Sequence, residues 1–220
     1  MNNKPILLSQ ILQYKCFFFD FDGVILESAN IKTEAFIELY TGSGFEEQIK
    51  EYHLANQGIS RFVKFRWIAE QLLQKTISEK EVLNLGEKFS TIVFEKILKT
   101  PFVPGVERLL KELKQAGKYL VIASGTPQEE LDLIVQKRNL GPFFQEVYGS
   151  PSQKKEIVAQ TMFNHNFEVN ECLFFGDAST DFEAAITNKI HFFTRYTAAL
   201  ANYWQEHVAE FVANDFEAII

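Results

Sequence analysis

Cysteine, histidine and basic residues are scarce in this chain of 220 residues. Its two cysteines, Cys16 and Cys172, each border an apolar run, and we expect reduced thiols near the core of a cytosolic protein. The four histidines are scattered without the spacing of a metal site, which argues against zinc. Because 29 acidic residues outnumber 22 basic ones, the net charge is −7, which argues against a nucleic-acid partner.

A hydrophobic run long enough to span a bilayer is also absent. The N-terminal segment "MNNKPILLSQILQYK" is too polar for a signal peptide. We therefore expect a cytoplasmic protein with no membrane partner.

Short apolar runs rich in aromatic and β-branched residues are present, and they are typical of strands buried on both faces of a parallel sheet. The clearest cover 16–21, 119–124, 171–177 and 190–196, and weaker ones cover 145–149 and 209–213. Helical patterns separate them, one over 105–118 and one that opens with a capping box from Thr126 to Glu129. This alternation predicts an α/β fold with a doubly wound, mainly parallel, Rossmann-like sheet. Its binding crevice should lie beyond the carboxyl ends of the strands.

Residues 29–100 break the alternation, because their patterns predict helices over 29–42, 60–75 and 78–99 and no convincing strand. We expect an all-helical cap domain over 29–100, inserted into a core domain formed by 1–28 and 101–220. An insert of this length can act as a lid over the crevice.

Two acidic pairs follow predicted strands. Asp20 and Asp22 end the first strand in "CFFFDFDGVILES", and Asp177 and Asp181 follow another in "CLFFGDASTD". Both pairs should converge at one edge of the sheet, where their mutual repulsion requires a cation. Oxygen-only ligation with open positions favours Mg²⁺.

Two further segments should reach the same edge. In "ASGT", Ser124 offers a hydroxyl and Gly125 a backbone amide to an anion at a helix N-terminus. In "GSPSQKKE", Lys154 could neutralise a phosphate, with Lys155 as the weaker alternative.

The segments "DFDGVILES", "VIASGT", "GSPSQK" and "GDASTD" occur in the order typical of the haloacid dehalogenase superfamily, which this sequence strongly resembles. The resemblance implies that Asp20 is a nucleophile that becomes an aspartyl-phosphate. It implies that Asp22 is the general acid and base, and that its backbone carbonyl ligates magnesium. Asp20 also belongs to the implied metal site.

The resemblance assigns the remaining motif residues to binding. Ser124 and Gly125 match the phosphate-binding motif, and Lys154 matches the lysine motif. Asp177 matches the metal-binding acid, and Asp181 is either a metal-shell residue or a partner that orients the lysine.

Within the superfamily, "DGVILES" and "GISRFVKF" are similar to the small helical-cap relatives of β-phosphoglucomutase and phosphoglycolate phosphatase. Gly58, Ser60 and Arg61 match the cap loop that meets the substrate, so Arg61 could grip a second phosphate or a carboxylate. The alternative is a solvated arginine at a helix start. Lys32 stands where the mutases carry a histidine, which counts against mutase activity and leaves Lys32 as a candidate substrate contact.

The sequence thus predicts a Mg²⁺-dependent phosphatase for a small phosphorylated metabolite, for example a sugar phosphate. Two alternatives stay open: a phosphomutase of the β-phosphoglucomutase type, and a catalytically silent phosphometabolite-binding protein. We expect a monomer or a weak dimer.

Overall fold

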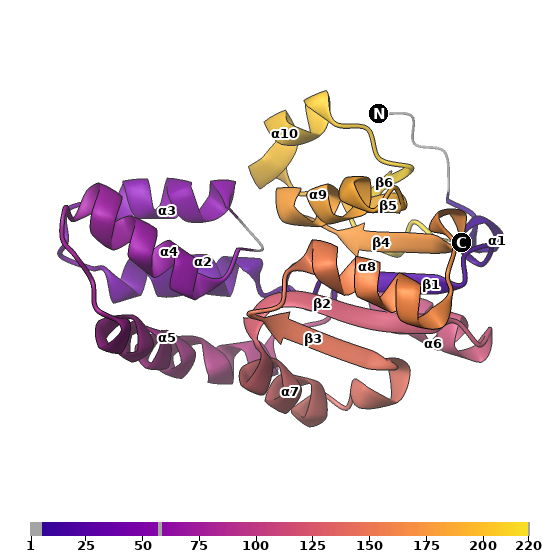
Figure 1. The fold of residues 1–220 in the computed structure, drawn as a ribbon, viewed down its shortest axis with the longest axis horizontal. Coiled ribbons are helices and arrows are strands. Elements are labelled where there is room, and N and C mark those ends of the chain that lie inside the picture. Colours follow the sequence, from indigo (N-terminus) through magenta and orange to yellow (C-terminus); the bar gives the residue numbers. More distant parts are fainter. Residues whose placement is uncertain (1–5, 57–58, 220) are drawn as a thin grey trace.

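The computed structural model describes residues 6–56 and 59–219 of the chain. Its centre is a six-stranded parallel sheet in the order β3-β2-β1-β4-β5-β6 (Figure 1). The strands are β1 (Cys16–Phe19), β2 (Tyr119–Pro127), β3 (Glu146–Ser150), β4 (Cys172–Gly176), β5 (His191–Arg195) and β6 (Phe211–Ala213). All six overlap the predicted runs, and the predicted doubly wound α/β fold is confirmed.

The side chains of β1 alternate between two buried layers. Phe17 and Phe19 pack on one face with α6 (Val106–Gln115) and α7 (Gln128–Lys137). Cys16 and Phe18 face the other layer, with α8 (Lys154–His165) and α9 (Ser179–Thr187). Because both faces are covered, every residue of β1 is buried, and the strand reads as a continuous apolar run. Burying each phenylalanine contributes about 1.5–3 kcal/mol, which fixes this strand as the base of the site.

Shorter elements complete this part of the structure. They are α1 (Leu8–Ile11), α10 (Ala201–Glu206) and the 3₁₀ turns η2 (Gly141–Phe143), η3 (Val169–Glu171) and η4 (Ala198–Leu200). In the part of the chain that the structure describes, no helix is long and apolar enough to cross a membrane.

Helices α2 to α5 form a separate group that we call the cap helices. They are α2 (Ala29–Leu39), α3 (Glu46–Ala55), α4 (Arg61–Trp67), which continues as the π-helical segment η1 (Ile68–Leu72), and α5 (Glu79–Lys99). Figure 1 shows them together on the side toward which the arrowheads of β3 and β4 point. The described residues between 29 and 100 contain no strand, as predicted. We retain as a proposal the division into a cap domain over 29–100 and a core domain over 1–28 and 101–220.

The cap helices bury an aromatic cluster of their own. Phe36, Phe65 and Phe89 come from three different helices, and their ring centroids lie 4.8–6.1 Å apart. Helix α3 was missed in the sequence because only Ile49 and His53 of its ten residues are buried, which leaves too weak an apolar pattern.

Candidate active site

The carboxyl end of β1 places Asp20 at the edge of the buried sheet. The amide of Asp20 donates to the carbonyl of Phe175 at 3.0 Å, and its side chain is almost fully buried. The chain then turns at Gly23, whose φ of +76° favours glycine. A Cβ atom at Gly23 would lie 2.1 Å from Oδ2 of Asp177, so the turn also needs glycine to admit that carboxylate.

Lys154 joins the two predicted acidic pairs. Its Nζ lies 3.0 Å from Oδ2 of Asp20 and 2.5 Å from Oδ1 of Asp181, and all three side chains are buried. Lys155 is exposed at the surface of α8. Of the two lysines in this motif, the structure brings Lys154 to the predicted site.

The start of α9 positions the second acidic pair. Oδ2 of Asp181 accepts the backbone amides of Asp177 and Ala178 at 3.2 and 3.0 Å. With its other oxygen on Lys154, Asp181 is held as an orienting partner for that lysine. At Gly176 a Cβ atom would lie 2.3 Å from Cβ of Asp181, so glycine is needed for this close approach.

Three buried carboxylates converge here. Asp20, Asp177 and Asp181 each offer an oxygen, and these oxygens lie within 4.8 Å of one another. Burial raises the pKa of Asp177 well above its usual value, and the charges of Asp20 and Asp181 raise it further. Burial also raises the pKa of Asp20 to about 7, although Lys154 opposes this shift. A set of three carboxylates whose negative charge is only partly offset by Lys154 fits a hard divalent cation such as Mg²⁺.

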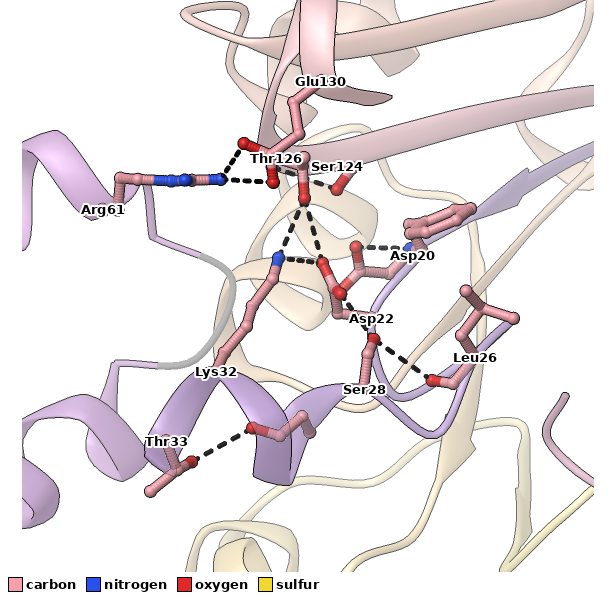
Figure 2. Close-up of polar contacts among 12 residues, drawn as sticks. Asp20, Asp22, Leu26, Ser28, Lys32, Thr33, Arg61, Ser124, Thr126 and Glu130 are labelled. Carbon is pink, nitrogen blue, oxygen red and sulfur yellow. Dashed lines mark hydrogen bonds and ion pairs between the residues drawn. The ribbon is translucent and has the colours of Figure 1, made fainter. Parts of the chain in front are cut away.

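Asp22 lies in a different network (Figure 2). Its Oδ1 accepts from the Ser28 hydroxyl at 2.5 Å, and its Oδ2 accepts from the Thr126 hydroxyl at 3.1 Å and from the Lys32 ammonium. Lys32 also donates to Thr126 at 2.8 Å. Burial favours the neutral acid, but Lys32 and these hydrogen bonds outweigh it and hold the pKa of Asp22 below its usual value. Both carboxylates therefore lie beside a lysine, but the pKa of Asp20 is raised and that of Asp22 is lowered.

The predicted capping box at Thr126 is wrong. Strand β2 continues through Pro127, which is the N-cap of α7, and Thr126 makes no side-chain cap. Its hydroxyl turns to Asp22 instead, while its amide donates to Oγ of Ser124 at 3.1 Å. Gly125 lines the same cavity as Asp20 and Asp22, so the predicted phosphate-binding segment does reach the site.

The alternative of a solvated Arg61 is also wrong. The side chain is buried, and its guanidinium donates to both oxygens of Glu130 at 2.8 Å and to Ser90 at 2.9 Å (Figure 2). Arg61 therefore ties α4 to α7. Ser60 precedes α4 as its N-cap without a side-chain cap bond, and Gly58 lies outside the described residues.

A cavity of about 50 Å³ is lined by the aspartates and by residues of the cap helices. Its polar walls are Asp20, Asp22 and Asp177 on one side and Lys32, His53, Arg61 and Lys64 on the other, with Phe36 and Phe89 among the apolar ones. His53 and Lys64 were not predicted as site residues. His53 stands in no recognised motif, and Lys64, although it lies within "GISRFVKF", is brought here by the packing of the cap helices. A second cleft, of about 540 Å³, lies beside Ser124, Gly125 and Lys154.

Comparison with known proteins agrees with this arrangement. A model of the family "Haloacid dehalogenase-like hydrolase" matches residues 17–194. A phosphoglycolate phosphatase of Vibrio vulnificus (strain CMCP6) is 25% identical over 183 residues, which cover 79% of each chain. The crystal structure of a β-phosphoglucomutase from Clostridium difficile superposes with a TM-score of 0.75 at 20% identity, covering 94% of this chain and 93% of that one.

A predicted phosphoglycolate phosphatase from Haemophilus somnus gives a TM-score of 0.71 at 17% identity and covers 93% of this chain and 95% of its own. At these identities the solved structures show a common fold. The expected similarity to phosphoglycolate phosphatase and β-phosphoglucomutase relatives is confirmed. Since the family model spans most of the sequence, the chain belongs to the haloacid dehalogenase-like hydrolase family.

Proposed function

We propose that the protein is a Mg²⁺-dependent phosphatase that hydrolyses a small phosphorylated metabolite, such as a sugar phosphate, through an aspartyl-phosphate on Asp20. One observation carries the proposal: Asp20 and Asp22 lie two residues apart but face different partners, Lys154 and Lys32. Two carboxylates whose environments separate their pKa values are suited to two different roles in acid and base chemistry.

In the first step an oxygen of Asp20 attacks phosphorus, and the bond from phosphorus to the leaving oxygen breaks. Lys154, at 3.0 Å, opposes the burial that raises the pKa of Asp20, and a divalent cation held at Asp20 and Asp177 would further favour the ionised form that this attack requires. Asp22 is the group placed to protonate the leaving oxygen. The charge of the incoming phosphoryl group would raise the pKa of Asp22 and allow it to hold that proton.

In the second step Asp22 takes a proton from water, whose oxygen attacks phosphorus while the bond to Asp20 breaks. The hydrogen bonds from Ser28 and Thr126 hold the Asp22 carboxylate in place for both proton transfers. The cavity beneath the cap helices limits bulk water around the aspartyl-phosphate.

Mg²⁺ would be held by Asp20 and Asp177, with the backbone carbonyl of Asp22 as the resemblance implies and Asp181 in the outer shell. When bound, it would offset the negative charge of the phosphoryl oxygens. The convergence of three buried carboxylates, only two of which pair with Lys154, supports this assignment.

The test is phosphate release from a panel of phosphorylated metabolites in the presence of Mg²⁺. We expect release from a subset of the panel, lost in EDTA and in Asp20→Asn. Turnover that is unchanged in Asp20→Asn would refute the proposal. A phosphomutase would instead convert one sugar phosphate into its isomer in the presence of the sugar bisphosphate, with little free phosphate.

A further inference from the structure

The cap helices bury a lysine that the sequence did not identify as a site residue. Lys64 of α4 is only 2% exposed, and its Nζ lies 3.0 Å from Nδ1 of His53 on α3. The ammonium also lies 5.5 Å from the centroid of the Phe36 ring. Both Lys64 and His53 line the cavity that contains Asp20 and Asp22.

Among the described residues, Lys64 has no acidic partner. Within 6–56 and 59–219, no carboxylate forms an ion pair with Lys64. Asp22, whose charge acts on Lys64, is already paired with Lys32. Burying an ammonium without a counter-charge is strongly unfavourable. The contacts of Lys64 in the described residues therefore do not explain why a lysine occupies this position.

His53, the hydrogen-bond partner of Lys64, cannot supply a negative charge. Burial, Lys64 and Lys32 lower the pKa of His53 to about 2, so its ring is neutral and accepts the lysine proton at Nδ1. His53 therefore positions the amino group without balancing it. Burial together with Lys32 also lowers the pKa of Lys64 to about 7, a shift that a bound anion would reverse.

We propose that Lys64 is a specificity-determining residue that binds a second anionic group of the substrate, a carboxylate or a second phosphate, at the cap side of the cavity. The inference rests on the proposed function, since the first anionic group is the phosphoryl group at Asp20. Arg61, the cation expected from the sequence to do this, is held by Glu130 and Ser90. Lys64 is free of such an ion pair among the described residues and shares the cavity with the catalytic candidates.

The dimensions favour a short substrate. The cavity beside the aspartates is small, at about 50 Å³, which disfavours a bulky substrate. Its apolar walls, Phe36, Ile59 and Phe89, would contact a short carbon skeleton between the two anionic ends. A substrate of this class carries its two charges a few bonds apart.

Binding to inactive protein tests the proposal without turnover. Asp20→Asn protein with Mg²⁺ is titrated calorimetrically with ethyl phosphate, phosphoglycolate and propanediol bisphosphate. The last two distinguish a carboxylate from a second phosphate. We expect at least one of these two to bind more tightly than ethyl phosphate. Lys64→Met in the same background should reduce that preference about 10- to 100-fold.

Kinetics on the active protein provide the second measurement. Lys64→Met should lower the ratio of kcat/KM for the doubly anionic probe over ethyl phosphate, mainly through KM. Lys88→Met, at an exposed position of α5, is the matched control and should keep the ratio. Thermal unfolding checks that the variant folds. Replacing a buried lysine that has no ion pair by methionine should not lower Tm. Lys64→Gln is a second variant that also removes the charge.

The outcomes separate the two proposals. A preference independent of Lys64, or no binding of any probe, overturns the role of Lys64. Lys64-dependent binding without phosphate release by the active protein would support the anion site and refute the phosphatase.

Discussion

Replacing Arg61 by methionine removes one partner of a buried ion pair between α4 and α7. The guanidinium donates to both carboxylate oxygens of Glu130 at 2.8 Å, and the two side chains are 4% and 9% exposed. Ser90 of α5 donates to the same carboxylate at 2.8 Å. The variant therefore leaves a buried carboxylate whose remaining partner, within 6–56 and 59–219, is the Ser90 hydroxyl.

The expected cost follows from that burial. Removing one partner of a buried, hydrogen-bonded ion pair destabilises a protein by about 3–5 kcal/mol, mainly because the remaining charge is unpaired. For a chain of this size, 3 kcal/mol corresponds to a fall in Tm of about 6–12 °C. The double variant Arg61→Met/Glu130→Met leaves no such charge and should be within about 1 kcal/mol of the native protein.

Chemical denaturation of the two single variants and the double variant measures these free energies of unfolding. Arg66 gives a matched control on the same helix, because its bidentate pair with Glu79 is exposed and its loss should cost less than about 1 kcal/mol. If Arg66→Met destabilises as much as Arg61→Met, burial is not the cause. If the double variant loses as much free energy of unfolding as the two single variants together, the ion-pair reasoning is refuted.

Three further predictions concern single positions of the site and the cap helices. Gly23→Ala should destabilise the protein and abolish activity, because its Cβ would lie 2.1 Å from a carboxylate oxygen of Asp177. Gly42→Ala is the control: it has a φ of +85° but nothing within 4 Å of the added Cβ, so it should show only the cost of backbone strain. The pKa of His53 falls from 6.5 to about 2 on folding, so its contribution to stability is present above pH 6.5 and is lost as the pH falls toward 2. At pH 5 this loss should reach about 2 kcal/mol in denaturation experiments, and His53→Gln should lack it. Thr126→Val should lower kcat roughly 10-fold by removing a hydrogen bond to Asp22, and an unchanged rate would exclude that role.

The sequence was sufficient to predict the strands and the strand ends at which the site residues lie. The aromatic run of β1 is buried on both faces, which is why its composition was so informative, and Asp20 follows directly from its end. Parallel strands share one carboxyl edge, so Asp177 and Lys154 could be expected near Asp20 before any coordinates were known. These are consequences of local pattern and topology.

Contacts across the cap could not be predicted in the same way. The pairing of Lys32 with Asp22 and of Arg61 with Glu130 depends on how α2 and α4 sit against the sheet, which no local pattern encodes. Thr126 was misassigned because a Thr-Pro at a strand end has the sequence of a helix cap, whereas the nearby Asp22 carboxylate takes its hydroxyl.

The central claim is that Asp20 carries the phosphoryl group, and trapping that group tests it most directly. Asp22→Asn protein with Mg²⁺ is given acetyl phosphate, whose leaving group needs no proton from Asp22, and is then quenched in acid. Because the base that would activate water is missing, we predict a phosphorylated protein whose modified peptide maps to Asp20. A phosphoryl group on another residue, or none while the native protein releases phosphate from acetyl phosphate, would contradict the account.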